Sequence, residues 1–464
     1  MRKVFITCFL ILCSFIVFSI DIEAKTENNE ETTILFKETV PEKEKEKILN
    51  GMNLKVEYEI PEINLVTVEA NNSKVNELKN NRNVDSVNES TTIDKPRSIT
   101  IPRSSTKMTT AEQENSNLDL WQYQWDMKAV TGNKKSYNIY TPSTKTVIGV
   151  IDSGIYKDHP DLANSIVKGS KNLVPRGGYN GTEPSEKGNI SDVDDKLGHG
   201  TGVAGQIAAN GLMKGAAPGI GIKSYRVFGT KSAKTPWVLK AIVEAAKDDV
   251  DVINLSLGEY MLVNGKYSDG KNDSAEYQAY KRVIDYAYKR GSIVVAAVGN
   301  DGIDVNNKNQ IKDILNSKNE DSKVVYGKVL DMPGDLNKVV TVGSTGPTQE
   351  ISIFSNYGKN FIDVLAPGGD FRLLQKYGED KWTNDSLFEK ELLVTTSMVG
   401  GYYFDAGVSY AAPKVSATLG LIVDKKRWKN EPYKTINHLK KYSTYRKDIT
   451  KKDSNLDIVN AISH

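Results

Sequence analysis

The amino-acid sequence predicts an α/β protein built on a doubly wound, mostly parallel β-sheet, preceded by a small α+β module. Two observations predict the sheet. Apolar runs such as TVIGVID, VDVINLSLG and GSIVVAAVGN resemble strands that are buried on both faces. These runs alternate with helical segments such as TPWVLKAIVEAAK, an order that is typical of parallel sheets. In such sheets we expect functional residues at the carboxyl ends of the strands.

The first element along the chain is an export signal. Arg2 and Lys3 precede an apolar run that ends at Ile20, and polar sequence follows. Charged, apolar and polar regions in this order indicate a secretory signal peptide, which we place at residues 1–24 with cleavage after Ala24. A retained N-terminal anchor is the alternative. No later apolar run reaches the ~18 residues that are needed to span a bilayer.

Both cysteines of the chain, Cys8 and Cys13, lie inside this signal. Leu12 stands where a lipoprotein signal would have a small residue, so we expect no lipid anchor. The mature protein is therefore predicted to have no disulfide and to be held together by its core or by metal ions. We expect an extracellular protein of Gram-positive type export. Because the chain ends in AISH, we expect release rather than attachment to the cell wall.

Composition and charge narrow the class of protein. The chain has 464 residues, 26% of them charged, and a formal net charge of +2. These values are typical of a globular protein. A dedicated nucleic-acid-binding protein is usually far more basic, so we expect no nucleic-acid partner. We also expect no membrane association after removal of the signal, and a monomer.

Residues 25–103 are predicted to form a separate unit ahead of the α/β unit, residues 104–464. The segments TILFKETV, LKVEYEI, INLVTVEA and NVDSVNES read as strands, and EKEKEKILN and SKVNELKN read as helices. The resulting order β-α-β-β-α-β is that of a split βαβ module. The linker from about Thr91 to Asn117 is polar, and we expect it to be exposed and open to cleavage.

Polar residues stand where functional groups are expected in the α/β unit. Asp152 ends the run VIGVID, Asn300 ends VVAAVGN, and His199 lies in GHGTGVAGQIAA, whose small residues would open a helix. A structural cap is the alternative for Asp152, and a buried, hydrogen-bonded histidine is the alternative for His199. The remaining histidines lie in polar or charged sequence, where a structural role is expected: His159, His438 and His464.

Ser409 is the predicted nucleophile. It lies in GVSYAAPKV and would open a helix whose N-terminal amides favour negative charge, with Pro413 in the first turn. The rival, Ser397 in TTSMVG, lacks the preceding glycine and the following proline. Acyl transfer by serine needs a base, a carboxylate that orients the base, and donors for the oxyanion. His199, Asp152 and Asn300 are the candidates for these parts.

The motifs DSGI, GHGTGVAG, SLG, VVAAVGN and GVSYAAPKVSA occur in an order that resembles the subtilisin-like serine peptidases, over roughly residues 121–462. The resemblance implies that Asp152 orients His199, that His199 is the general base and that Ser409 attacks. It further implies that Asn300 and the Ser409 backbone N–H stabilise the oxyanion, without a catalytic cofactor.

The resemblance also identifies the N-terminal module as similar to the family's propeptide, which assists folding and inhibits the enzyme. Two residues depart from the family pattern. Val408 and Tyr410 stand where the family usually has Thr and Met. Neither side chain performs the chemistry, so these departures concern the fit of the substrate.

A pocket for the residue before the scissile bond (S1) follows from the same resemblance. Its rim would include Asp301, which follows Asn300, and its floor would be Asp331, two residues before Pro333-Gly334. Two carboxylates in one pocket favour Arg or Lys. Two solvated loop aspartates are the alternative. The walls would come from the SLG strand: Ser256, Leu257 and Gly258.

The linker contains two sites that such a pocket would accept. In DKPRS and TIPRS, Arg97 and Arg103 each follow a proline and precede a serine. A zymogen that cuts itself must contain a bond that fits its own pocket. Pro-Arg also resembles the end of many lantibiotic leader peptides. Together these features resemble the lantibiotic leader peptidases of Gram-positive bacteria, whose substrate is a lantibiotic precursor.

Two other functions compete with this interpretation. A general secreted subtilase would share the catalytic motifs but would have a neutral S1 pocket and broad specificity. A non-catalytic pseudopeptidase that only binds peptides would have lost a catalytic residue, and none is lost here.

The sequence leaves two questions open. Asp161 in HPDL matches a position that ligates structural calcium in many relatives, but residues 208–215 look short for a cage of about six oxygens. The sequence therefore leaves a structural calcium ion open without establishing one, and we assign no metal-ligating residues. The segments 259–280, 302–330 and 370–392 either flank the substrate groove or form surface loops.

Overall fold

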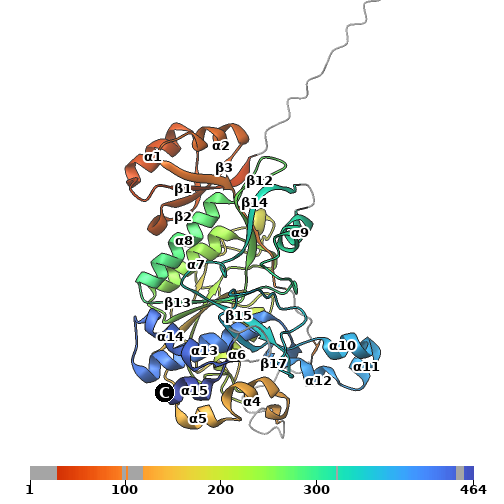
Figure 1. The fold of residues 1–464 in the computed structure, drawn as a ribbon. Coiled ribbons are helices and arrows are strands. Elements are labelled where there is room, and N and C mark those ends of the chain that lie inside the picture. The colour runs from red at the N-terminus through yellow and green to blue at the C-terminus, as the bar shows by residue number, and fades with distance from the viewer. Residues whose placement is uncertain (1–28, 97–100, 103–118, 320–321, 446–453) are drawn as a thin grey trace, which may run out of the picture.

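The computed structural model describes residues 29–96, 101–102, 119–319, 322–445 and 454–464. A small α+β module stands at one end of a larger α/β unit (Figure 1). The predicted signal peptide and both linker arginines, Arg97 and Arg103, lie outside the described residues. No described helix is long and apolar enough to cross a membrane.

The N-terminal module has the predicted element order β-α-β-β-α-β. Its four antiparallel strands lie in the order β2-β3-β1-β4. Alternate residues of β1 face two different cores: Ile34 and Phe36 pack in the core of the module, whereas Leu35 packs with residues of the α/β unit. The elements are β1 (Glu30–Phe36), α1 (Glu42–Gly51), β2 (Val56–Ile60), β3 (Leu65–Ala70), α2 (Asn72–Lys79) and β4 (Val84–Glu89).

The α/β unit is built on a nine-stranded sheet in the order β19-β20-β16-β15-β13-β11-β7-β9-β8. All neighbouring pairs are parallel except β19 and β20, so the predicted mostly parallel sheet is confirmed. The strands are β7 (Val147–Asp152), β8 (Lys171–Asn172), β9 (Gly221–Arg226), β11 (Val252–Leu255), β13 (Ile293–Ala297), β15 (Val339–Thr345), β16 (Val364–Pro367), β19 (Thr444–Tyr445) and β20 (Ser454–Asn455).

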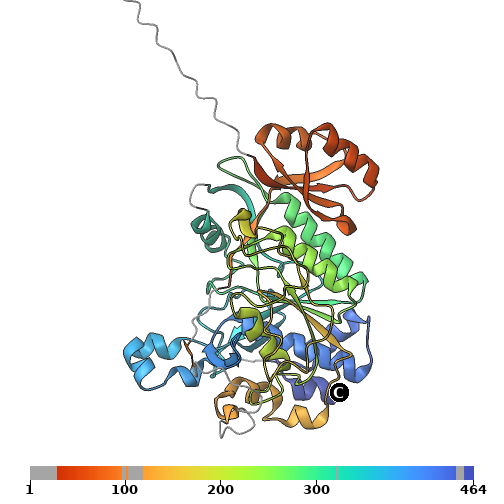
Figure 2. The same cartoon turned by 180° about the vertical axis from the view of Figure 1, so that it is seen from behind.

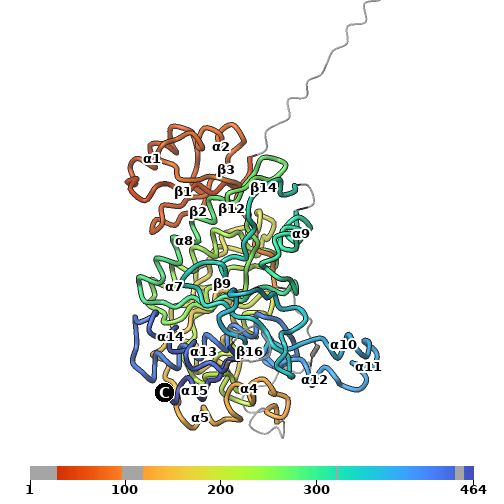
Figure 3. The backbone as a smooth tube through the Cα atoms, viewed as in Figure 1, coloured from red at the N-terminus to blue at the C-terminus, as the bar shows by residue number. Residues whose placement is uncertain are grey.

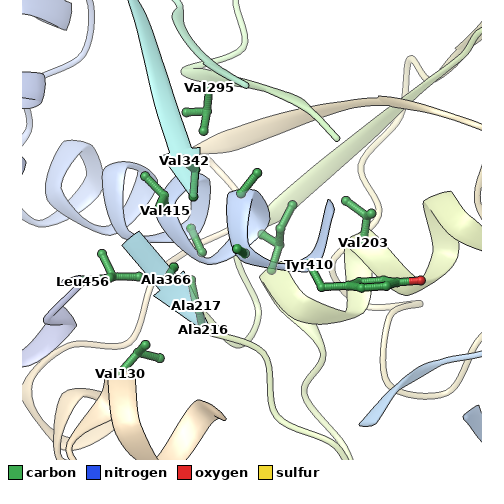
Figure 4. Packing of buried hydrophobic residues seen from close by; sticks show 14 of the residues in the cluster. Val130, Val203, Ala216, Ala217, Val295, Val342, Ala366, Tyr410, Val415 and Leu456 are labelled. Carbon is green, nitrogen blue, oxygen red and sulfur yellow. The ribbon is translucent and has the colours of Figure 1, made fainter. Parts of the chain in front are cut away.

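Helices cover both faces of this sheet, because its strands are apolar on both sides. On one face, α6 (His199–Ala208) and α13 (Val408–Lys426) pack against the strands; Figure 4 shows Val415 of α13 near Val342 of β15. On the other face lie α7 (Thr235–Lys247) and α8 (Ser274–Lys289). Further helices surround the first face: α4 (Trp125–Thr131), α5 (Lys135–Ile139), α14 (Pro432–Tyr442) and α15 (Ile458–Ser463).

Pro413 corrects one sequence-based expectation. It is the sixth residue of α13, which begins at Val408, and so does not lie in the first turn. A proline at this position leaves the Ser409 carbonyl without its usual helical N–H donor. The hydroxyl of Ser256 replaces that donor, at 2.7 Å. The proline thus ties the start of α13 to the SLG segment.

The open segments 259–280 and 302–330 form a small unit with a core of its own. Strand β12 (Glu259–Tyr267) pairs with β14 (Val324–Met332), and α9 (Lys308–Lys318) packs on them. The segment 370–392 forms a lobe that protrudes from the molecule in Figures 1 and 3. The lobe contains α10 (Arg372–Tyr377), α11 (Glu379–Asn384) and α12 (Phe388–Glu391).

Two short pairings join the N-terminal part of the chain to the α/β unit. Strand β5 (Thr92–Ile93) pairs with β10 (Ala233–Lys234). Strand β6 (Ile101–Pro102) pairs with β18 (Tyr402–Asp405), which forms a hairpin with β17 (Leu393–Thr396). The module itself rests against α7 and α8, as the views from front and back agree (Figures 1 and 2).

Candidate active site

Asp152 and His199 meet at the carboxyl edge of the sheet. Asp152 is the last residue of β7, and His199 is the first residue of α6. The two carboxylate oxygens lie 2.8 and 3.0 Å from His199 Nδ1, and both side chains are buried. The Ser153 backbone N–H donates to the same carboxylate at 2.7 Å. A carboxylate held at Nδ1 leaves Nε2 to accept a proton.

A glycine allows this close approach of α6 to the strand end. A Cβ at Gly200 would lie 2.2 Å from the Gly154 carbonyl oxygen and 3.2 Å from the Cβ of Asp152. Any side chain there would push the helix, and His199 with it, away from the carboxylate. The glycine after His199 is therefore required by packing at the site.

The environment of His199 favours the imidazolium. Burial acts to lower the pKa of His199, and the Asp152 carboxylate acts against burial through its charge and its hydrogen bond. The carboxylates of Asp405 and Asp195 act in the same direction, and the pKa of His199 is raised above its ordinary value. A base in this setting holds a proton that it takes from a hydroxyl.

Ser409 is the second residue of α13, and the start of this helix lies near His199. Its hydroxyl donates to the Ser256 carbonyl at 3.1 Å. The ring of the next residue, Tyr410, lies with its centroid 5.6 Å from that of the His199 ring. The Ser409 hydroxyl must leave the Ser256 carbonyl before it can donate to the imidazole, a change that is common when substrate binds.

Asn300 lies at the start of α13 and lines the same cavity as Ser409. Its Oδ1 accepts the backbone N–H of Val408 at 2.9 Å. This contact fixes the side-chain amide. Its NH₂ group has no partner among the described residues and can donate into the cavity that Asn300 and Ser409 both line. An amide donor in this place can stabilise negative charge on a carbonyl oxygen that Ser409 attacks.

A cavity of about 490 Å³ lies next to Ser409, and the residues predicted above for the S1 pocket line it. Asp331 is only 3% exposed and lies at its base, near the Gly258 backbone, whereas Asp301 is exposed at the rim. The predicted walls also line it: Ser256, Leu257 and Gly258. The structure thus brings the two carboxylates and the candidate nucleophile to one cavity.

Sequence reasoning missed the two residues that connect these carboxylates. The Tyr260 hydroxyl donates to Asp301 at 2.5 Å, and the Asn356 amide donates to the Tyr260 oxygen at 2.7 Å and to Asp331 at 3.3 Å. Tyr260 lies two residues after SLG, and this closeness to a predicted wall of the pocket is a signal that the sequence does contain. Asn356 lies in an irregular segment, and nothing in the sequence connects it with the pocket.

Burial raises the pKa of Asp331 well above its ordinary value. The hydrogen bond from Asn356 acts against burial without reversing it, while the nearby Asp335 and Asp301 raise the pKa further. Lys318 acts weakly in the opposite direction. This environment therefore favours a neutral carboxyl, which would ionise when a cationic side chain enters.

The chain's own linker reaches into this cavity. Asp94, Lys95 and Pro96 line it together with Ser409, and Asp94 forms an ion pair with Lys318 at 3.4 Å. Strand β6, residues 101–102, pairs with β18, whose last residue precedes Ser409 by four positions. The two described ends of the linker therefore flank the candidate nucleophile.

The side chains around Asp161 do not fit a cation. Its carboxylate accepts the backbone N–H groups of Leu212 at 3.2 Å and Met213 at 2.9 Å, and the Tyr402 hydroxyl at 2.9 Å. A Cβ at Gly211 would lie 1.8 Å from one of its oxygens. Calcium needs oxygen ligands, not N–H donors. Within the described ranges, no group of three acidic, His or Cys residues could hold a metal.

The other singled-out side chains have structural contacts. His159 bonds the Gly401 carbonyl at 3.1 Å, and His438 bonds the Ala461 carbonyl at 2.8 Å. The Ser397 hydroxyl accepts the Val399 N–H in the turn between β17 and β18. None of these three residues lines the cavity at Ser409.

Comparisons with known proteins agree with this geometry. The family model described as "Subtilase family" matches residues 143–454. The chain is 41% identical over 412 residues to the epidermin leader peptide-processing serine protease EpiP of Staphylococcus epidermidis, covering 88% of this chain and 85% of that protein. It is 48% identical over 324 residues to the nisin leader peptide-processing serine protease NisP of Lactococcus lactis, covering 70% of this chain and 46% of that protein.

Solved structures give the same result. The crystal structure of EpiP from Staphylococcus aureus matches with a TM-score of 0.81 and 37% identity, over 94% of this chain and 98% of that chain. The structure of NisP from Lactococcus lactis matches with a TM-score of 0.70 and 44% identity, over 74% and 94%. With its doubly wound sheet and this family match across the α/β unit, the chain belongs to the subtilase family and is a subtilisin-like serine endopeptidase.

Proposed function

We propose that the protein is a secreted endopeptidase, made as a self-processing zymogen, that cleaves after Pro-Arg to remove the leader peptide of a lantibiotic precursor. The acidic cavity beside Ser409 carries this proposal. It holds one buried and one exposed carboxylate, Asp331 and Asp301, where a broad-specificity relative would have a neutral pocket. The two relatives named above are leader peptidases of epidermin and nisin, which supports the class of substrate.

The proposed reaction uses the residues that the site brings together. Ser409 Oγ attacks the scissile carbonyl carbon while its proton passes to His199 Nε2, and Asp152 stabilises the imidazolium. The Asn300 amide and the Ser409 backbone N–H bind the oxyanion. His199 then gives the proton to the leaving amine, and water releases the acyl group by the same steps in reverse order.

The N-terminal module and linker, residues 25–103, are the proposed propeptide, and residues 104–464 are the proposed peptidase domain. The path of the linker favours Arg97 over Arg103 as the cleavage site. Pro96, one residue before Arg97, lines the S1 cavity, whereas Pro102, one residue before Arg103, pairs with Tyr403 of β18. Cleavage after Arg97 would begin the mature chain at Ser98, so residues 98–103 would stay with the peptidase and the released propeptide would end at Arg97.

Arg97→Gln should prevent self-maturation, because a neutral side chain does not pair with the acidic pocket. Arg103→Gln is the matched control, since it removes the same group from the same Pro-Arg-Ser context and should mature normally. The measurement is N-terminal sequencing and mass of the secreted protein, which should begin at Ser98 in the wild type and the control. A start at Ser104, or normal processing of Arg97→Gln, would contradict the assignment.

A buried acid joins the module to the peptidase unit. Glu276 of α8 accepts hydrogen bonds from the side chain of Asn88 and from the Thr91 backbone N–H, and Asn88 accepts the Ala275 N–H at 2.6 Å. Burial raises the pKa of Glu276 to about 7, although hydrogen bonds from Thr33 and Asn88 act to lower it. The bound module thus favours the protonated form of Glu276.

Release of the module should therefore depend on pH. If departure of the module exposes Glu276, its pKa returns towards 4.5, so its contribution to binding is fully present below about pH 4.5 and is lost as the pH rises through about 7. A shift of this size corresponds to roughly ten- to a few-hundred-fold in affinity. Size-exclusion chromatography of the self-cleaved protein should show the module retained at pH 5 and released at pH 8.

Glu276→Gln should keep the module bound at both pH values, because the amide cannot ionise. The matched control is Asp85→Asn, which breaks the 2.7 Å ion pair with Arg282 at the same interface. It should weaken binding at every pH without removing the pH dependence. Equal retention of the wild-type module at pH 5 and pH 8 would show that Glu276 does not control release.

A further inference from the structure

A second buried carboxylate contacts the tyrosine that lies against the His199 ring. Asp405, at the end of β18, is fully buried, and its oxygens accept the Tyr410 hydroxyl and the Ala406 backbone N–H, both at 2.8 Å. Two donors at its two oxygens fix the orientation of this carboxylate. Asp405 lies four residues before Ser409, and Tyr410 directly follows it. The chain itself therefore holds both residues close to the candidate nucleophile.

Tyr410 connects Asp405 with the imidazole. Its ring is tilted by 45° to the His199 ring, with the centroids 5.6 Å apart. Its hydroxyl lies 3.3 Å from that of Tyr403, which is also 3.3 Å from the Gly198 carbonyl oxygen, just before His199. Tyr410, Tyr403 and Asp405 therefore form a buried layer behind His199 that runs from β18 to the start of α6.

The neighbouring sequence makes room for this layer. A Cβ at Gly202 of α6 would lie 2.5 Å from the Tyr403 hydroxyl oxygen and 3.2 Å from the Tyr410 ring. The glycine therefore accommodates two tyrosines, and any larger residue in its place would displace them. Gly202 of α6 and Tyr410 of α13 thus fit against each other, and the same two helices carry His199 and Ser409.

We propose that Asp405 and Tyr410 are positioning residues of the peptidase: Tyr410 holds the imidazole of His199 in place, and the fixed Asp405 carboxylate stabilises the positive charge that His199 acquires from Ser409. The proposal rests on the proposed role of His199 as the general base. It gives a reason for the tyrosine that follows the nucleophile. From the sequence alone, we related Tyr410 only to the fit of the substrate.

The charges around His199 agree with this role. Three carboxylates act on it: Asp152 from β7, Asp195 from the loop before α6, and Asp405 from β18. Burial lowers the pKa of His199, and these carboxylates together raise it. Burial also raises the pKa of Tyr410 and of Tyr403 well above the ordinary value, so both hydroxyls stay protonated and can donate.

The test is the pH dependence of kcat/KM of the mature enzyme on a Pro-Arg peptide between pH 5 and pH 9. Asp405→Asn should lower the apparent pKa of the acidic limb by about half a unit or more and lower kcat several-fold, with KM little changed, because a stabilising charge has been removed from the imidazolium. Tyr410→Phe keeps the ring but not the hydroxyl, and it should shift the limb in the same direction by less.

The matched control is Asp161→Asn, another buried carboxylate that accepts a tyrosine hydroxyl from β18 but does not act on His199. It should lower the melting temperature without moving the acidic limb. An acidic limb of Asp405→Asn that superimposes on the wild type would overturn the proposal. If Asp405→Asn does not fold, Tyr410→Phe decides in the same way, since an unshifted limb there overturns it too.

A second readout does not require activity. In the Ser409→Ala background, an NMR titration of the His199 imidazole should show a lower pKa after Asp405→Asn, and an unchanged pKa would contradict the inference. Failure of the proposed function is distinguishable, because it would appear as peptide cleavage by Ser409→Ala itself, whatever the state of Asp405.

Discussion

Ser409→Ala should abolish peptide cleavage and leave the secreted zymogen uncut. The reason is that the Ser409 hydroxyl is the proposed nucleophile: Ser409 lines the S1 cavity together with Asn300, and the ring of the next residue, Tyr410, lies near the His199 ring. Loss of the nucleophile lowers kcat by about 10⁶-fold in subtilisin, itself a relative in this family. The measurement is turnover of a Pro-Arg peptide together with gel analysis of the secreted protein.

The matched control is Ser397→Ala, the other serine in a similar run of small residues. Ser397 closes the turn between β17 and β18, so its loss should change stability slightly and leave both cleavage and maturation intact. Maturation of Ser409→Ala at the wild-type rate would show that a different protease trims the linker.

Asp331→Asn should convert an Arg-directed enzyme into one with little preference at S1. A buried charge-assisted contact contributes about 2–3 kcal/mol, so kcat/KM for Pro-Arg peptides should fall roughly 30- to 150-fold. Asn keeps the size of the side chain and can still bond Asn356. Peptides with Leu or Phe in place of Arg should be cleaved as well as before or better, because their binding no longer buries an acid.

The rim carboxylate gives the matched comparison. Asp301→Asn should have the smaller effect, because Asp301 is exposed and solvent screens its charge. The pH dependence supplies a further check. Since burial raises the pKa of Asp331, cleavage of Arg peptides should improve relative to Leu peptides as pH rises and the carboxyl ionises. Equal wild-type cleavage after Phe and Arg would favour the general subtilase instead.

The catalytic candidates could be predicted from sequence because strand ends are easily read. Each of Asp152 and Asn300 follows a continuous apolar run, and parallel strands must end at the same edge of the sheet. The motif around His199 could be recognised for a related reason, because the close approach of α6 to β7 requires a glycine at position 200. Local pattern and topology together determine where these side chains meet.

Contacts between distant irregular segments could not be predicted in this way. Asn356 reaches Asp331 from an irregular stretch with no periodicity, and Asp161 turned out to accept hydrogen bonds rather than to face a cation. Pro413 was expected in the first turn because a proline is normally tolerated there. Its true position depends on the Ser256 hydroxyl, which replaces a helical donor from another segment.

The pairing of the linker with β10 on one side of the site and β18 on the other has a kinetic consequence. A bond held at both ends within its own molecule is presented to the nucleophile at an effective concentration that no free peptide reaches. In the proposed maturation, the first turnover of each molecule is therefore a first-order event, indifferent to dilution. A peptide substrate from outside would have to compete with this tethered linker for the cleft. Each enzyme molecule would therefore cleave other substrates only after it has cleaved its own linker.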